Sequence, residues 1–221
     1  MIREGKVRLN GGVSRNPETP VRLGIDRIAV AGQRLAAAEK IYLMLNKPRG
    51  IVTTASDERG RDTVYSLLPR GMPWIAPVGR LDKASEGLLL LTNDSAWAAR
   101  VSDPATHLAK TYHVQIGARA SDEILGKLTR GIATEKGELL RAKNTDILRA
   151  GKKNCWMEIV LEEGKNRQIR RMFHGLGVEV LRLIRVSIGS IELGDLAKGA
   201  CRALRPEEKS QLDEQMRTAG S

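Results

Sequence analysis

The segment 79–94 constrains the fold of this chain more than any other. Its second half, Leu88–Leu91, is an unbroken apolar run that is closed by three polar residues. An apolar run of this length, with turn residues on both sides, suits a strand buried on both faces better than a helix. We therefore expect a sheet that is covered on both sides, with this strand inside it.

The first half of the same segment is polar. Between Gly79 and Gly87 it carries four charged residues, namely Arg80, Asp82, Lys83 and Glu86. Charged side chains at the mouth of a buried strand are held by a rigid scaffold and remain exposed, which is where binding and catalytic sites are usually built. On composition alone, an ordinary solvated loop is the simpler interpretation.

The order of residues in this segment resembles a known signature. Gly79–Asp82, a spacer and then the run from Gly87 to Asp94 resemble the signature of pseudouridine synthases of the RsuA/RluB type, which modify ribosomal RNA. Further segments resemble that family in the family's order, namely Leu45–Gly50, Lys110–Tyr112, Glu163–Met172 and Leu181–Arg185. Together they extend from Ile41 to Leu204, and five motifs in register make the resemblance specific.

The resemblance implies an α+β fold. We expect a curved mixed or antiparallel sheet with flanking helices and a central cleft over residues 39–221, preceded by a truncated alpha-L RNA-binding module and linker over residues 1–38. Residues 5–35 fit the small sheet of such a module, since Asn10-Gly11 is a turn signal. The helix that normally opens the module is missing, so either the start is truncated or the module is degenerate. A linker is expected at 36–40.

The same resemblance assigns the site residues. It points to Asp82 as the catalytic residue and to Arg80 as a substrate contact. It implies that Tyr112 stacks on a flipped-out base, that Arg170 pairs with Asp82 and that Leu183 packs under the base. A carboxylate is ionised at neutral pH without a base to activate it, so the chemistry requires no Ser-His or Cys-His pair. Whether the Asp attacks the anomeric carbon or abstracts a ribose proton stays open.

Residues 167–176 have the pattern of an amphipathic helix. Ile169, Met172, Phe173 and Leu176 recur at i, i+3, i+4 and i+7, and make one apolar stripe. The arginines fall on the other side, where a solvated basic face is the alternative to a function. The candidate RNA-binding residues are Lys47, Lys110, Lys165, Arg167, Arg171 and Arg185. Glu86 could act as a second carboxylate in a glycosidase-like pair, but we interpret it as structural.

The charge of the chain indicates its partner. There are 37 Lys and Arg against 26 Asp and Glu, a net charge of +11. Such a surface favours a polyanion, most often nucleic acid. We expect a monomer acting on ribosomal RNA or an assembly intermediate. The segment Glu163–Gln168 resembles the large-subunit members of the family more than the small-subunit ones, which favours large-subunit RNA. The alternative is a non-catalytic RNA-binding or ribosome-assembly protein that keeps the cleft.

Several other classes of protein fit the sequence poorly. No apolar run approaches the roughly 20 residues that a membrane-spanning helix needs. The N-terminus has no apolar segment of a signal peptide, so we expect a cytoplasmic location. Cys155 and Cys201 are isolated in the sequence, and the histidines show no ligand spacing around them. We expect neither a metal nor a cofactor.

Overall fold

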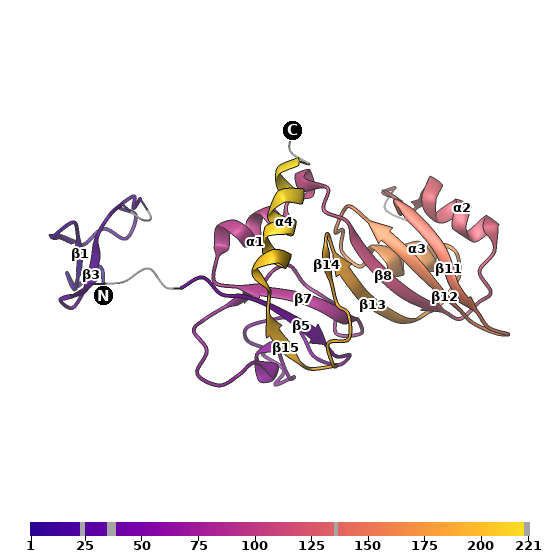
Figure 1. Ribbon diagram of the computed structural model, residues 1–221, viewed down its shortest axis with the longest axis horizontal. Coiled ribbons are helices and arrows are strands. Elements are labelled where there is room, and N and C mark those ends of the chain that lie inside the picture. The colour runs from indigo at the N-terminus through magenta and orange to yellow at the C-terminus, as the bar shows by residue number, and fades with distance from the viewer. Residues whose placement is uncertain (23–24, 35–38, 135–136, 219–221) are drawn as a thin grey trace. The chain divides into compact units, whose positions relative to one another are not determined.

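The computed structural model describes residues 1–22, 25–34, 39–134 and 137–218 (Figure 1). The chain divides into two compact units, Met1–Lys40 and Ile41–Ser221. The predicted linker at 36–40 lies mostly outside the described residues.

The N-terminal unit is a small antiparallel sheet. Its strands lie in the order β2-β1-β3-β4, with the bounds β1 Val7–Leu9, β2 Gly12–Ser14, β3 Ile28–Val30 and β4 Gln33–Arg34. Asn10 and Gly11 both have positive φ, 49° and 89°. This is the backbone that a two-residue hairpin turn requires, so the predicted turn is confirmed. The truncated alpha-L module itself stays a prediction.

The second unit is organised around one mixed sheet. Its strands follow the order β11-β12-β8-β13-β7-β5-β15, while β14 pairs with β13 and β6 with β7. The bounds are β5 Tyr42–Lys47, β6 Ala76–Pro77, β7 Glu86–Thr92, β8 Lys110–Ile116, β11 Asn144–Ala150, β12 Cys155–Leu161, β13 Val180–Ile188, β14 Ile191–Glu192 and β15 Cys201–Ala203. The pair β13–β7 is parallel, whereas β8 is antiparallel to both of its neighbours. The predicted α+β class with a mixed sheet is confirmed.

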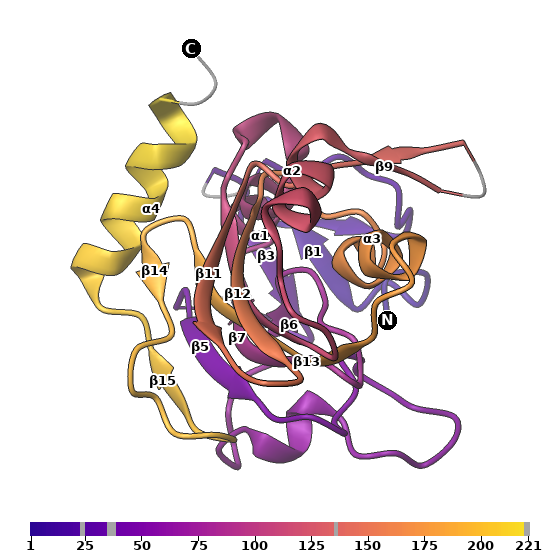
Figure 2. The same ribbon diagram turned by 90° about the vertical axis from the view of Figure 1, so that its right-hand side faces the viewer.

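Helices cover both faces of this sheet. They are α1 Ser95–Ser102, α2 Asp122–Arg130, α3 Gln168–Gly175 and α4 Pro206–Thr218, with short 3₁₀ turns η1 Val64–Leu67 and η2 Pro104–Thr106 and a hairpin of β9 Ile132–Ala133 and β10 Leu139–Leu140. In Figure 2 the yellow helix α4 lies on one side of the strands and α3 on the other. No helix in the described part of the chain is both long and apolar enough to cross a membrane.

Strand β7 lies inside the sheet between these two helical layers. All four residues of Leu88–Leu91 are 0% exposed. Leu89 and Leu91 join the core that contains the apolar stripe of α3, whereas Leu88 and Leu90 join the core under α1 and α4. Because side chains alternate along a strand, an unbroken apolar run fills two cores at once. The strand buried on both faces is therefore confirmed.

Candidate active site

The polar segment before β7 has an unusually well-anchored backbone. Each carbonyl oxygen from Leu81 to Ser85 accepts a hydrogen bond. Side chains supply four of the donors: Thr53 Oγ1 binds the carbonyl of Leu81 (2.8 Å), Lys47 Nζ binds those of Asp82 (3.1 Å) and Ser85 (2.8 Å), and Arg170 Nη2 binds that of Ala84 (2.9 Å). Backbone nitrogens supply the other two: Ser85 N binds the carbonyl of Asp82 (2.9 Å) and Gly50 N binds that of Lys83 (2.8 Å). A loop held at every peptide fixes the direction of its side chains, which a reacting group requires.

Lys47 is one of these anchors, and its side chain does not reach the protein surface. Its side chain is 0% exposed, and its ammonium also donates to the carbonyl of Pro48 at 3.0 Å. The prediction that Lys47 binds RNA is therefore wrong. As the last residue of β5, it points under the loop, where carbonyl oxygens rather than phosphates surround it. Burial lowers the pKa of Lys47 to about 8, although Asp82 and Glu86 act in the opposite direction.

The lowered pKa of Lys47 predicts a pH dependence of stability. Between pH 8 and the ordinary value near 10.5, the unfolded chain binds the proton of Lys47 more tightly than the folded chain does. The contribution of Lys47 to the free energy of unfolding should therefore rise with pH across this window. We expect wild type to gain on the order of 1–3 kcal/mol relative to Lys47→Met between pH 7.5 and 10 in urea unfolding. Parallel curves for the two proteins would contradict this.

Next to the anchored loop lies a cleft of about 370 Å³. It brings together all the predicted site residues except Lys47, Arg170 and Arg171. Its walls include Arg80, Asp82, Lys110, Tyr112, Glu162, Lys165, Arg167, Leu183 and Arg185. This volume suits a ligand the size of a nucleotide, and the charge of the listed side chains is predominantly positive.

Asp82 is paired in this cleft, but with a different arginine from the predicted one. Arg167 Nη1 lies 3.5 Å from Asp82 Oδ2, and the two side chains are 52% and 31% exposed. The prediction that Arg170 makes this ion pair is wrong. The helix α3 begins only at Gln168, and Arg167 precedes it with φ 49° and ψ 33°. This left-handed turn lets Arg167 reach the carboxylate.

Arg170 holds the loop backbone instead. Besides Ala84, its guanidinium contacts the carbonyl of Val180 at 3.4 Å. Its Nε is buried and has no hydrogen-bond partner among the described groups. Burial, reinforced by the neighbouring positive charge of Arg167, lowers the pKa of Arg170. Arg170 therefore holds the backbone of Ala84, two residues after Asp82, and affects the position of Asp82 only through that backbone.

The different positions of Arg170 and Arg171 predict different effects on stability. We expect Arg170→Ala to lower the free energy of unfolding by about 1–3 kcal/mol, because the partly buried carbonyl of Ala84 loses its donor. Arg171→Ala is the matched control, since that side chain is 33% exposed and paired with Glu138. It should change stability by about 1 kcal/mol or less. Equal losses in thermal melts of the two variants would contradict the anchoring role.

Tyr112 and Leu183 provide a flat apolar surface in the cleft. Tyr112 lies on β8 and Leu183 on the neighbouring strand β13, and both are buried in the same core. Arg185 is directly opposite Tyr112 in the strand pairing, so their side chains leave the sheet on the same face. A planar ring entering the cleft would therefore meet an aromatic surface and a guanidinium side by side.

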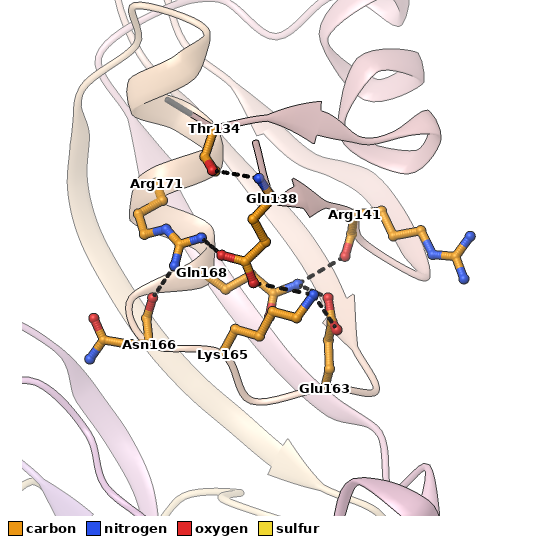
Figure 3. A network of polar contacts seen from close by, with 8 residues as sticks. All are labelled: Thr134, Glu138, Arg141, Glu163, Lys165, Asn166, Gln168 and Arg171. Atoms are coloured by element: carbon orange, nitrogen blue, oxygen red, sulfur yellow. Dashed lines mark hydrogen bonds and ion pairs between the residues drawn. The ribbon is translucent and has the colours of Figure 1, made fainter. Parts of the chain in front are cut away.

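A polar network surrounds Lys165 at the edge of the cleft (Figure 3). Lys165 lies 3.0 Å from Glu163 and 3.4 Å from Glu138, which also pairs with Arg171. The buried Gln168 donates to Glu163 at 2.7 Å. Two of the predicted RNA contacts, Lys165 and Arg171, thus already have carboxylate partners, and phosphate would have to compete with these.

Glu86 has the structural role that we expected. It is buried, and its carboxylate is bound by Arg182 and Lys198. These contacts lower its pKa although burial acts to raise it. Because Glu86 forms ion pairs with both of these cations and does not line the cleft, it is not placed to act as a second catalytic carboxylate.

The sequence analysis did not identify the loop 52–62 as part of the site. This loop forms a second hollow that shares Arg80, Leu81 and Asp82 with the cleft. Its other walls include Thr53 and Arg59. The only indication in the sequence is the polar composition of this loop. Composition does not distinguish a loop that lines a binding site from an ordinary solvated loop. Among the described residues, no group of three His, Cys, Asp or Glu side chains is arranged to hold a metal ion.

Known proteins resemble this chain in sequence and in fold. Residues 41–175 match the RNA pseudouridylate synthase family. The ribosomal large subunit pseudouridine synthase B of Bacillus subtilis is 38% identical over 96% of this chain and 87% of that protein. An uncharacterized RNA pseudouridine synthase of Aquifex aeolicus is 35% identical over 96% of this chain and 85% of its own. The crystal structure of a pseudouridylate synthase superposes with a TM-score of 0.72 at 29% identity, over 96% of this chain and 90% of that one. The chain therefore belongs to the RNA pseudouridine synthases, the isomerases that form pseudouridine in RNA.

Proposed function

We propose that this enzyme converts a specific uridine of ribosomal RNA to pseudouridine, with large-subunit RNA as the substrate and Asp82 as the catalytic residue. The observation that carries the proposal is the position of Asp82. It lies on a loop anchored at each carbonyl from Leu81 to Ser85, in the wall of a cleft that also contains Tyr112.

The residues of the cleft fit the steps of this reaction. A uridine inside a stack cannot react, so it must be flipped out at a cost of a few kcal/mol. Stacking on Tyr112 would offset this cost, since one base on an aromatic ring contributes roughly 1–3 kcal/mol. Leu183 would support the base from the sheet. The carboxylate of Asp82 then acts at the ribose, either on the anomeric carbon or on a ribose proton.

Two arguments support large-subunit RNA. The segment Glu163–Gln168 resembles the large-subunit members of the family, and a relative with 38% identity is named for the large subunit. In the reaction, C5 of the base loses its hydrogen when it is rejoined to the ribose. Transcripts of 23S and 16S RNA labelled with tritium at C5 of uridine should therefore release tritium from 23S alone. Release from 16S alone would reverse the assignment.

The position of the uridine can be mapped in cells. Carbodiimide mapping of pseudouridines in RNA from cells with and without the protein should show one site that depends on it. A protein that only assists ribosome assembly would bind the transcripts without releasing tritium, and would leave the map unchanged.

The excess of positive charge predicts a strong effect of salt on RNA affinity. If the lysines and arginines contact phosphates, the logarithm of the affinity should fall by about 0.7–0.9 per contact for each decade of salt. The measurement is a titration of 23S RNA fragments from 50 to 300 mM salt by filter binding. A flat titration would indicate that phosphate contacts contribute little.

A further inference from the structure

Among the described residues, two cations that are at least half-buried in the cleft have no counterion. Arg185 is 5% exposed, and its Nε donates to the carbonyl of Leu88 at 2.8 Å. Its Nη2 is buried and has no hydrogen-bond partner in the part of the chain that the structure describes. Lys110 Nζ donates to the carbonyl of Leu108 at 3.0 Å. In the described structure, neither Arg185 nor Lys110 forms an ion pair with a carboxylate. Burying a guanidinium without such a partner is costly, so a ligand that supplies negative oxygen is expected here.

The strand pairing places these cations beside the aromatic surface. Arg185 on β13 is directly opposite Tyr112 on β8, and Lys110 lies two residues before Tyr112 on the same strand. Residues two apart on a strand share a face. All three line the cleft. Burial, and then the charge of Arg185, lowers the pKa of Lys110, which agrees with two cations close together in a partly dry site.

We propose that Arg185, with Lys110 beside it, binds the carbonyl oxygens of the flipped uracil and stabilises the negative charge of the base while it is detached from the ribose. This inference rests on the proposed function. Both residues were expected to bind RNA, and the structure assigns them to the reacting base rather than to the backbone.

The detached uracil becomes negatively charged whether Asp82 attacks the anomeric carbon or abstracts a ribose proton. The C1′–N1 bond breaks, and its electron pair goes to uracil, where it is shared with the carbonyl oxygens. The C1′–C5 bond then forms with an electron pair from the ring, the proton on C5 is released and N1 takes up a proton. Fixed cations aimed at oxygens that gain charge lower the barrier, and removing one such donor typically costs about 10²–10³ in rate.

Phosphate is the other source of negative oxygen, and the burial of Arg185 argues against it. Phosphates stay on the RNA backbone outside the flipped base, so they meet exposed cations at the surface. Lys165 and Arg167 line the same cleft with side chains 37% and 52% exposed. A phosphate can therefore reach them without losing most of its water, although it would compete with their carboxylate partners. A phosphate at Arg185 would have to lose much of its water.

The test separates the rate of the reaction from RNA affinity. Single-turnover rates at saturating protein, and dissociation constants, are measured for Arg185→Gln, Lys110→Met and the control Lys165→Met, on RNA containing the mapped uridine. We expect Arg185→Gln to react about 10²–10³-fold more slowly and Lys110→Met about tenfold more slowly, with affinities within about threefold of wild type. Lys165→Met, at a candidate phosphate contact, should lose more affinity than rate. Weaker binding by Arg185→Gln and Lys110→Met at an unchanged rate would overturn the proposal in favour of phosphate.

A change in the substrate distinguishes contact from structure. Sulfur is a weaker hydrogen-bond acceptor than oxygen, so RNA with 2-thiouridine or 4-thiouridine at the target should react more slowly with wild type at the contacted position. The same sulfur should have little further effect on a variant that lacks the contact. Equal effects of sulfur on wild type and variants would overturn the proposal.

Lys110→Met keeps the test decisive if Arg185→Gln does not fold, because both the rate and the sulfur effect can be read from it. If Lys110→Met matches wild type in both, the proposal fails. Absence of tritium release by wild type itself would instead remove the proposed function, and this inference with it.

Discussion

Replacing Asp82 with Asn is expected to abolish pseudouridine formation while the fold and the affinity for RNA stay close to those of wild type. Asn keeps the size and polarity of the side chain but removes the ionised oxygen that the chemistry requires. Losing a group that acts directly at the reacting atoms typically costs about 10⁴-fold or more in turnover. The measurement is single-turnover tritium release from 23S RNA.

Folding should be nearly unaffected by this substitution. The ion pair of Asp82 with Arg167 is 3.5 Å long and partly exposed, and pairs of this kind contribute about 0–1 kcal/mol. The loop is held through its carbonyl oxygens, which Asn retains. Thermal melts of Asp82→Asn and wild type should therefore nearly coincide.

Glu162→Gln is the matched control. Glu162 also lines the cleft, but its carboxylate pairs with Lys143 at the surface. The same isosteric change there should leave turnover within a few-fold of wild type. If Asp82→Asn retains turnover within tenfold of wild type, or if Glu162→Gln loses as much activity, Asp82 is not the catalytic residue.

The elements that the sequence predicted well are those with a strong hydrophobic pattern. The run Leu88–Leu91, expected as a strand buried on both faces, lies within β7, Glu86–Thr92. The stripe of α3 is confirmed, because a period near 3.6 identifies the buried face of a helix. Strand β11 was missed. It is the outermost strand of the sheet, and every residue in it except Thr145 is exposed, so it has no alternating apolar pattern.

The site was predicted at the level of residues but not of contacts. The motifs identified Asp82, Tyr112 and Leu183, which do meet in one cleft. The motifs did not show that Lys47 and Arg170 bind backbone carbonyls. Every residue type has a carbonyl oxygen, so a hydrogen bond to the backbone leaves no pattern of residue types in the sequence. Arg167 reaches Asp82 through a left-handed backbone turn. Such turns are rare outside glycine and are not predictable from an arginine.

Replacing Gly87 with Ala is expected to cause the largest loss of stability of any single methyl added at the site. Gly87 is the second residue of β7, has φ +103° and pairs with Arg185 of β13 in the parallel part of the sheet. A Cβ built there would lie 2.2 Å from the carbonyl oxygen of Arg185 and 2.8 Å from its nitrogen. Both are backbone atoms, so no rotation of a side chain relieves the contact. The two strands would have to separate at the centre of the sheet.

The magnitude follows from two separate costs. A strained backbone at positive φ costs about 1–3 kcal/mol, and overpacking costs about 1–3 kcal/mol more. At about 2–4 °C for each kcal/mol in a domain of this size, the melting temperature should fall by about 4–24 °C. Gly79→Ala is the matched control, since Gly79 has φ +71° but nothing within 4 Å of an added Cβ. It incurs only the strain, so its melting temperature should lie clearly between those of wild type and Gly87→Ala. If the two variants melt together, the close approach of β7 and β13 at Gly87 does not limit stability.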